Sequence, residues 1–239
     1  MPKTYFLTGA NRGIGLEFVR QLASDPSTTI IAGVRSKAGD VDLSALTALN
    51  TNKNIHIIEC DVSSLDSLSS IEFRVAEILS RTGANLDFLF NVAGINSSSS
   101  DTSLSIDPES LAKHMQTNVL GPAKIVESLR RYLARGAVVL NMTSGLGSLA
   151  VASEITKCCT YSMSKAALNM LTVHQAKDLK AAGVKVICVD PGWVKTRMGG
   201  KGAMLEAEDS VGSMLGFIAE LKDEHNGKFF LYDGTPRPW

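Results

Sequence analysis

Tyr161 and Lys165 are the two side chains best suited to acid–base chemistry in this sequence of 239 residues. On a helix their four-residue spacing places both on one face, one turn apart. Because an ammonium held near a phenol favours the phenolate, we expect Lys165 to lower the pKa of Tyr161 from its usual value of about 10. Such a tyrosine can donate and accept protons near neutral pH. An amphipathic surface helix gives the same pattern, so the pair needs support from the rest of the chain.

A glycine-rich turn near the N-terminus predicts a dinucleotide-binding site. Residues 3–8 form a short apolar run, and Thr8-Gly9-Ala10-Asn11-Arg12-Gly13-Ile14-Gly15 separates this run from a helical pattern. In such a turn Gly9 permits the change of direction, Gly13 lets the backbone approach a pyrophosphate, and Gly15 lets the helix pack against the strand. The N-terminus of the following helix attracts phosphate groups.

The residue after the second predicted strand, over residues 28–34, indicates which dinucleotide is bound. An NAD-binding sequence places an acidic residue about 20 positions after the glycines, to bind the ribose 2′-hydroxyl. Here the residue is Arg35, and a cation suits the 2′-phosphate of NADP(H) instead. Arg12, inside the turn, is a second candidate for the same phosphate.

The rest of the chain alternates strand and helix patterns. Further strands are predicted over residues 55–60, 86–90, 136–142, 184–189 and 228–232. Helices are predicted within 40–54, over 64–81, from Asp107 through Asn118 towards Leu120 with a kink or restart at Gly121-Pro122, from before Tyr161 to about Ala182, and over 205–222. This alternation predicts one Rossmann-type domain over residues 1–239, a doubly wound parallel sheet with helices on both faces. The candidate residues follow strand ends, where such sheets bind ligands.

Asp61 and residues 97–101 come after the third and fourth predicted strands. Asp61 follows the third strand and can accept a hydrogen bond from an adenine amino group, or cap the helix predicted over 64–81. The sequence favours neither role. Residues 97–101, four serines and an aspartate, predict a solvated loop.

Composition excludes several classes of protein. Lys and Arg number 24, as do Asp and Glu, so the formal net charge is zero and no nucleic-acid-binding surface is indicated. We find no signal pattern at the start of the sequence and no apolar stretch long enough to span a membrane. The four cysteines lack metal-ligand or disulfide spacing and predict reduced thiols in a cytoplasmic protein. The scattered histidines predict no metal site.

Together these residues resemble the short-chain dehydrogenase/reductase family over nearly the whole chain. The turn at residues 8–15 resembles the family's TGxxxGxG, and residues 91–94 resemble NNAG with Val92 in place of the second asparagine. Pro191, Gly192 and Thr196 match its PG-x3-T segment. The run at residues 192–196 and the C-terminal tail are most similar to the Sniffer and C-factor-like carbonyl reductases, although Arg197 replaces an aspartate beside the pocket.

The resemblance implies NADPH-dependent reduction of an aldehyde, ketone or quinone to an alcohol. Tyr161 would protonate the carbonyl oxygen, Ser144 would hydrogen-bond it, Lys165 would lower the Tyr161 pKa and hold the cofactor ribose, and Asn118 would order a water. The catalytic residues implied are therefore Asn118, Ser144, Tyr161 and Lys165. The cofactor contacts implied are Gly9, Asn11, Arg12, Gly13, Ile14, Gly15, Arg35, Asp61, Val62, Asn91, Ala93, Gly94, Tyr161, Lys165, Pro191, Gly192, Val194 and Thr196.

Three further expectations concern partners. The expected substrate is a small carbonyl compound. Six mostly apolar residues either form the rim of its pocket or are ordinary core or lid packing: Ile95, Leu146, Cys158, Trp193, Met198 and Met204. Family members commonly pair through the helices beginning near residues 108 and 161, so a homodimer is expected. The alternative function is an NADP(H)-binding signalling or regulatory protein with little turnover, because a fold does not dictate function.

Overall fold

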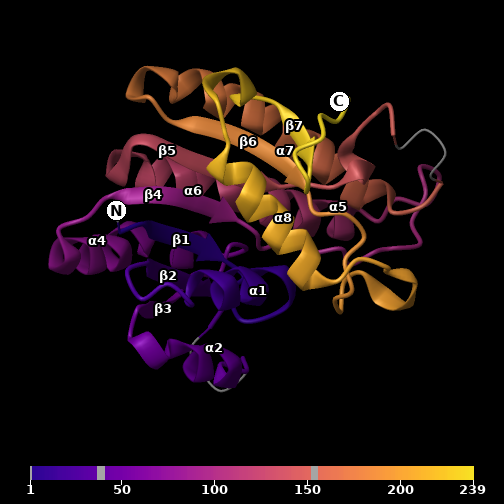
Figure 1. Ribbon diagram of the computed structural model, residues 1–239. Helices are drawn as coiled ribbons and strands as arrows, with labels where there is room; N and C mark the ends of the chain where they lie inside the picture. Colours follow the sequence, from indigo (N-terminus) through magenta and orange to yellow (C-terminus); the bar gives the residue numbers. More distant parts are fainter. Residues whose placement is uncertain (1, 37–40, 152–155) are drawn as a thin grey trace.

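Parallel strands form the centre of the structure, a computed structural model that describes residues 2–36, 41–151 and 156–239 (Figure 1). The described strands are β1 (Thr4–Thr8), β2 (Thr29–Val34), β3 (Ile55–Glu59), β4 (Leu86–Asn91), β5 (Leu133–Met142), β6 (Lys185–Asp190) and β7 (Phe229–Leu231). They form one sheet in the order β3-β2-β1-β4-β5-β6-β7, and every neighbouring pair is parallel. The strand order reverses between β1 and β4, the position at which such sheets bind ligands. The predicted doubly wound parallel sheet is confirmed.

Helices cover both faces of this sheet (Figure 1). They are α1 (Gly13–Leu22), α2 (Ser44–Leu49), α3 (Leu65–Ser69), α4 (Ile71–Thr82), α5 (Pro108–Met115), α6 (Gly121–Leu129), α7 (Cys159–Asp178) and α8 (Ala207–Ala219). One apolar cluster joins the sheet to α4, α6 and α7, and a second joins the opposite face to α1, α2 and α8. Neighbouring residues of β1 alternate between them, Phe6 in the first cluster and Leu7 in the second.

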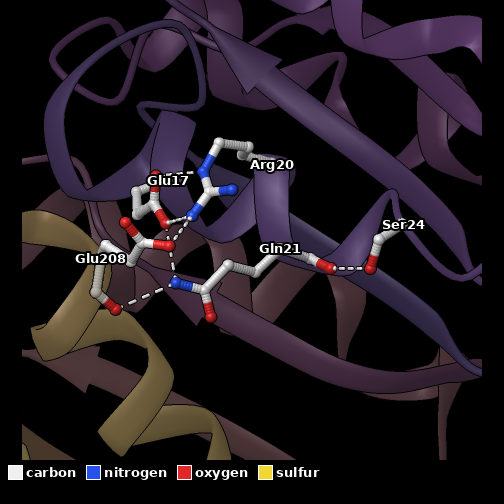
Figure 2. A network of polar contacts seen from close by, with 5 residues as sticks. All are labelled: Glu17, Arg20, Gln21, Ser24 and Glu208. Atoms are coloured by element: carbon white, nitrogen blue, oxygen red, sulfur yellow. Dashed lines mark hydrogen bonds and ion pairs between the residues drawn. The ribbon is translucent and has the colours of Figure 1, made fainter.

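A polar network ties α1 to the start of α8 (Figure 2). Arg20 donates to both carboxylate oxygens of Glu17, at 2.8 and 2.6 Å, and to Glu208 at 2.9 Å. Gln21 donates to Glu17 and to the Glu208 carbonyl. These contacts join elements that follow β1 and β6 on the same face of the sheet. Because they are largely exposed, each pair contributes only about 0–1 kcal/mol to stability.

Several helices differ from the sequence-based expectation. The helix predicted over 64–81 is two helices, α3 and α4, with Ser70 between them in a helical conformation that ends one and precedes the other. The helix predicted to reach Ala182 ends at Asp178, and a 3₁₀ turn covers Lys180–Ala182. The helix predicted over 205–222 is α8, over Ala207–Ala219. Within residues 40–54 the structure has α2 and a 3₁₀ turn, Asn50–Asn52, whereas residue 40 lies outside the described part.

A π-helical turn, Gln116–Leu120, connects α5 to α6 at the predicted kink. Pro122 is at the beginning of α6 and has no backbone N–H to donate, so the regular hydrogen-bond ladder cannot continue through it. Gly121 is required by close packing, since a Cβ there would lie 2.6 Å from the Val62 carbonyl oxygen. A π turn widens the helix by one residue and often occurs at functional sites. Here it carries Asn118.

The described helices include none that is long and apolar enough to cross a membrane. All four cysteines are free thiols, and Cys60, Cys158 and Cys188 are buried.

Candidate active site

Tyr161 and Lys165 lie on the buried face of α7, as their spacing predicts. The Lys165 Nζ donates a hydrogen bond to the Met142 carbonyl oxygen at 2.7 Å, at the end of β5. The same nitrogen is 5.6 Å from the centre of the Tyr161 ring. The ammonium therefore lies beside the phenol, but its shortest hydrogen bond to the protein is made with the backbone. Lys165 links the catalytic helix to the carboxyl end of the sheet.

The predicted lowering of the Tyr161 pKa is wrong for this arrangement. Burial disfavours the phenolate and raises the pKa of Tyr161, and nearby Asp190 and Cys158 raise it further. The Ser144 side chain acts in the opposite direction and lowers the pKa of Tyr161, but it does not outweigh burial. Burial also lowers the pKa of Lys165, to about 8. At neutral pH Tyr161 is thus a protonated phenol, which is the form that a proton donor requires.

Ser144 reaches Tyr161 because a tight turn follows β5. Its hydroxyl accepts a hydrogen bond from the Leu146 backbone N–H at 3.2 Å, which starts the 3₁₀ turn Gly145–Gly147. That turn packs directly on α7, since a Cβ at Gly147 would lie 2.8 Å from the Lys165 Cβ. The Ser144 hydroxyl therefore fixes its own turn and also contacts the phenol.

Asn118 holds the segment after β4 against the catalytic helix. Its Oδ1 accepts from the Ile95 backbone N–H at 2.9 Å, and its Nδ2 donates to the Ile95 carbonyl at 3.0 Å and to the Ser164 hydroxyl at 2.9 Å. Both amide hydrogens are therefore used. One lone pair of Oδ1 remains free, and it could accept a hydrogen bond from the ordered water that the resemblance implies. Asn118 is fully buried, so these bonds are well protected from solvent.

The glycine-rich turn has the close approaches that a dinucleotide cradle needs. Gly9 has a φ of 69°, and a Cβ at Gly15 would lie 2.2 Å from the Gly9 carbonyl oxygen. A Cβ at Gly94 would lie 3.2 Å from the Asn118 Oδ1 and 3.5 Å from the Lys165 Nζ. The Thr8 hydroxyl accepts from the Val92 and Ala93 backbone N–H groups at 3.1 and 3.0 Å, which joins the ends of β1 and β4. A side chain at Gly15 would distort the turn, and a side chain at Gly94 would fill the space beside Asn118 and Lys165.

Three arginines converge beside this cradle. The pKa of Arg12 is lowered, first by burial and then by the charges of Arg197 and Arg35. Thr196 lies against the turn as well, because a Cβ at Gly13 would be 3.4 Å from its Cγ2. The sequence placed Arg197 beside a substrate pocket, whereas the structure puts its charge within reach of Arg12. Clustered positive charges of this kind create a potential that attracts a polyanion.

Two predicted cofactor residues have local roles that the sequence did not distinguish. The Asp61 Oδ1 accepts from the backbone N–H and the hydroxyl of Ser63, at 2.9 and 2.6 Å. Ser64 rather than Asp61 caps α3, so the capping alternative for Asp61 is wrong. Asn91 is on β4, next to Asn141 on β5, and its Nδ2 donates a hydrogen bond to the Asn141 Oδ1 at 2.8 Å. Its Oδ1 is buried with no hydrogen-bond partner.

The remaining predicted cofactor residues lie at the carboxyl end of the sheet. Asn11 is half-buried in the turn after β1, Ile14 is half-buried at the start of α1, and Val62 is buried after β3. After β6, Pro191 is buried and its carbonyl accepts from the Ser210 hydroxyl at 2.7 Å. Val194 forms a β-bridge with Leu205.

Three of the six predicted rim residues are exposed apolar side chains: Trp193, Met198 and Met204. All three lie in the segment that follows β6 and its Pro191-Gly192 turn. The Trp193 indole N–H donates to the Gly199 carbonyl at 2.7 Å, which fixes the ring on this segment. Ile95 and Leu146 are half-buried, and Cys158 is buried. The segment after β6 therefore offers apolar surface next to the site.

Sequence reasoning missed an ion pair next to the turn that follows Ser144, between buried Asp190 and half-buried Arg237. The Asp190 Oδ2 accepts from the Arg237 Nη2 at 3.0 Å, and its Oδ1 accepts from the Gly192 backbone N–H at 3.0 Å. A hydrogen bond from Gly145 also reaches this carboxyl. Asp190 thus joins the turn after Ser144, the Pro191-Gly192 turn and the C-terminal tail. Arg237 is 47 residues away in sequence, so no local pattern reveals the pair.

We expect Arg237→Met to lower the free energy of unfolding by about 3 kcal/mol, because it leaves a buried carboxylate without its cation. Urea unfolding at neutral pH measures the change. Arg81→Met is the matched control, since Arg81 pairs with Glu77 at the surface and should cost less than about 1 kcal/mol. A loss no larger than that of the control would show that backbone N–H groups satisfy Asp190 by themselves.

Comparison with known proteins agrees with this geometry. Residues 3–204 match the short chain dehydrogenase family. An oxidoreductase of Schizosaccharomyces pombe is 30% identical, over 99% of this chain and 98% of that protein. The carbonyl reductase Sniffer of Drosophila melanogaster superposes with a TM-score of 0.90 at 31% identity, covering 100% of both chains. An NADPH-bound carbonyl reductase from chicken fatty liver superposes with a TM-score of 0.88 at 28% identity, covering 99% of both.

Three findings lead to one conclusion. The family matches, the parallel sheet reverses its order beside a glycine cradle, and half-buried Ser144 lies with buried Tyr161 and Lys165 at the carboxyl edge of the sheet. This chain is an oxidoreductase of the short-chain dehydrogenase/reductase family.

Proposed function

We propose that this protein is an NADPH-dependent carbonyl reductase that converts an aldehyde, ketone or quinone to an alcohol. The observation that carries the proposal is the buried Tyr161 phenol, kept protonated by burial, on the same helix face as Lys165 and within the influence of the Ser144 side chain. A phenol in this state is ready to give a proton to a carbonyl oxygen. The names of the Drosophila and chicken structures, both carbonyl reductases, support the same reaction.

The residues present fit NADPH. Gly9, Gly13 and Gly15 provide the close backbone approach for the pyrophosphate, with the N-terminus of α1 behind it. Arg12 and Arg35 would hold the 2′-phosphate, and the charge of Arg197 adds to the same attraction. The Asp61 carboxylate would accept from the adenine amino group through its remaining capacity. Asn11, Ile14, Val62, Asn91, Ala93, Gly94, Pro191, Gly192, Val194 and Thr196 would line the rest of the cofactor site.

When bound, NADPH supplies the hydride that reduces the carbonyl carbon. The Ser144 hydroxyl donates a hydrogen bond to the carbonyl oxygen and holds it next to the phenol. Tyr161 then donates its proton as negative charge develops on that oxygen. Lys165, positively charged below its pKa of about 8, stabilises the tyrosinate that remains. Asn118 keeps Ile95 and Ser164 in place around this pair and assists reprotonation through an ordered water.

A panel of aldehydes, ketones and quinones tests this function, with NADPH consumption followed by its absorbance. We expect turnover of at least one apolar carbonyl compound, because the segment after β6 exposes Trp193, Met198 and Met204 beside the site. Binding of NADPH is measured separately by fluorescence titration. Tight binding without turnover of any compound would favour a regulatory NADP(H)-binding protein, and absence of binding would reject both functions.

We also propose a homodimer formed through α5 and α7. Met163 and Met170 are seven residues apart on α7, so both lie on its outward face, and both are exposed; Met115 at the end of α5 is exposed as well. Such an apolar face suits an isologous contact. Light scattering at micromolar concentration should give twice the mass of the chain, and Met170→Glu should give a single chain. A wild-type protein with the mass of one chain would contradict this.

A further inference from the structure

The catalytic helix α7 is capped by a residue from another part of the chain. Cys158 occupies the cap position with a φ of 60° and no side-chain capping bond. Asp101 replaces it: its Oδ2 accepts from the Thr160 backbone N–H at 3.0 Å and from the Thr160 hydroxyl at 2.6 Å. The Asp101 carbonyl also accepts from the Cys159 N–H at 3.3 Å. A buried carboxylate at this end of a helix is stabilised by the helix dipole.

Thr160, which the Asp101 carboxylate binds, also forms a hydrogen bond with His114, a fully buried residue on α5. The Ser97 backbone N–H donates to the His114 Nε2 at 3.0 Å, so this nitrogen is an acceptor and the ring proton is on Nδ1. The Nδ1 contacts the Thr160 hydroxyl at 3.0 Å. Since that hydroxyl donates to Asp101, it must accept from His114. His114 therefore donates to Thr160, and Thr160 donates to Asp101. The donor in each bond is fixed, because the Ser97 backbone N–H can only donate and the carboxylate can only accept.

This chain of bonds lies beside the catalytic phenol. Thr160 precedes Tyr161, and the His114 and Tyr161 rings meet edge to face with centres 6.1 Å apart. The loop over residues 95–101 includes residues 97–101, which were predicted to be solvated. It is held at both ends: Asn118 binds Ile95, and the His114 and Thr160 contacts hold Ser97 and Asp101. The prediction of solvation is wrong for Asp101, which is 5% exposed.

We infer that His114, Thr160 and Asp101 are positioning residues that fasten the loop over residues 95–101 to α7 and so form the wall of the carbonyl-binding site next to Tyr161. The loop also touches Cys158 there, whose Sγ donates to the Ser99 carbonyl at 3.1 Å. The contacts act on the substrate side, because none of the residues proposed to hold the cofactor belongs to the loop over residues 95–101. The effect of these three residues on catalysis rests on the proposed carbonyl reduction. Their effect on the position of the loop is independent of that function.

The device requires a neutral histidine. Protonation would place a hydrogen on Nε2, facing the Ser97 N–H, and would release the loop. Burial lowers the pKa of His114, the charge of Lys165 on α7 lowers it further, and the charge of Asp101 on the loop raises it. Because the folded-state pKa is below that of the unfolded chain, the unfolded chain binds the proton first on acidification. Stability from this group is therefore present at neutral pH and is lost as the pH falls through about 6.5 and below.

The first experiment uses Thr160→Val, which removes the hydroxyl at nearly constant volume. We expect the KM for a carbonyl substrate to rise about tenfold or more, as when one charge-assisted hydrogen bond is lost, with kcat changed much less and NADPH affinity unchanged. Thr160→Ser should restore the wild-type KM. Asp107→Asn is the control: it alters an exposed capping carboxylate, that of α5, which accepts from the Ser110 N–H at 2.9 Å.

The second experiment measures hydrogen–deuterium exchange at Ser97–Asp101 in the protein without substrate, so it does not depend on any activity. Thr160→Val and Asp101→Asn should speed exchange there while the Asp107→Asn control does not. In the wild type, protection of this loop should fall below a pH of about 6.5. In His114→Gln, whose amide oxygen can accept from Ser97 but does not titrate, protection should be independent of pH over that range.

Unchanged exchange in Thr160→Val, or the same acid-dependent loss of protection in His114→Gln, would overturn the inference. So would a fall in kcat and NADPH affinity along with the rise in KM, because that pattern indicates general loss of structure. If no carbonyl compound is turned over but the loop responds as described, the proposed function fails and the positioning device stands.

Discussion

Replacing Tyr161 with phenylalanine is expected to abolish carbonyl reduction and leave NADPH binding nearly intact. The buried phenol is the proposed proton donor, and a positioned general acid contributes about 10²–10⁴-fold to rate. The ring remains packed in Tyr161→Phe, and the glycine turn and Lys165, which we propose hold the cofactor, are untouched. Steady-state kinetics with the best substrate of the panel and fluorescence titration with NADPH measure the two effects.

Tyr5→Phe is the matched control for this variant. Tyr5 is on β1, where its ring stacks on Phe88 at 4.4 Å between ring centres, and removal of its hydroxyl should leave turnover unchanged. Lys165→Ala should instead reduce both turnover and NADPH binding, since Lys165 serves the phenol and the cofactor ribose. Retention of most turnover by Tyr161→Phe would show that another group provides the proton.

The second large effect concerns cofactor choice. We expect the wild-type protein to prefer NADPH over NADH by at least about tenfold in kcat/KM, because one charge-assisted contact to the 2′-phosphate contributes about 1.5–3 kcal/mol and ~1.4 kcal/mol is a factor of ten. Arg35→Asp should reverse the preference. It removes a phosphate partner, adds repulsion, and supplies the acceptor that a ribose 2′-hydroxyl needs. Both cofactors are compared at one fixed salt concentration.

Arg81→Asp provides the control for charge, since it makes the same change at the far end of α4, where Arg81 pairs with Glu77. Its cofactor preference should equal that of the wild type. Arg12 and Arg197 retain part of the attraction for phosphate in Arg35→Asp, so the loss of NADPH affinity should be incomplete. Equal use of NADH and NADPH by the wild type would contradict the assignment of these arginines, whatever the variants do.

The sequence alone was sufficient for the architecture and the family, and it named the candidate groups that the structure brings together at the site. Apolar runs such as Val138-Val139-Leu140 are buried on both faces of a parallel sheet, and their alternation with helical segments leaves few possible topologies. The spacing of Tyr161 and Lys165 determines a shared helix face, and the glycines determine where a backbone can approach a phosphate. These features depend on local geometry, which the order of residues specifies directly.

The tertiary structure decided the electrostatic state of the site and the contacts that hold it. Lys165 was expected to lower the Tyr161 pKa, but depth of burial outweighs the charge, and burial is set by every element packed around α7. Asp101 caps α7, Arg237 pairs with Asp190, and His114 holds the loop through the Ser97 backbone N–H. Each of these joins segments far apart in sequence. Hydrogen bonds and desolvation depend on distances in the folded chain, and no local pattern of residues contains those distances.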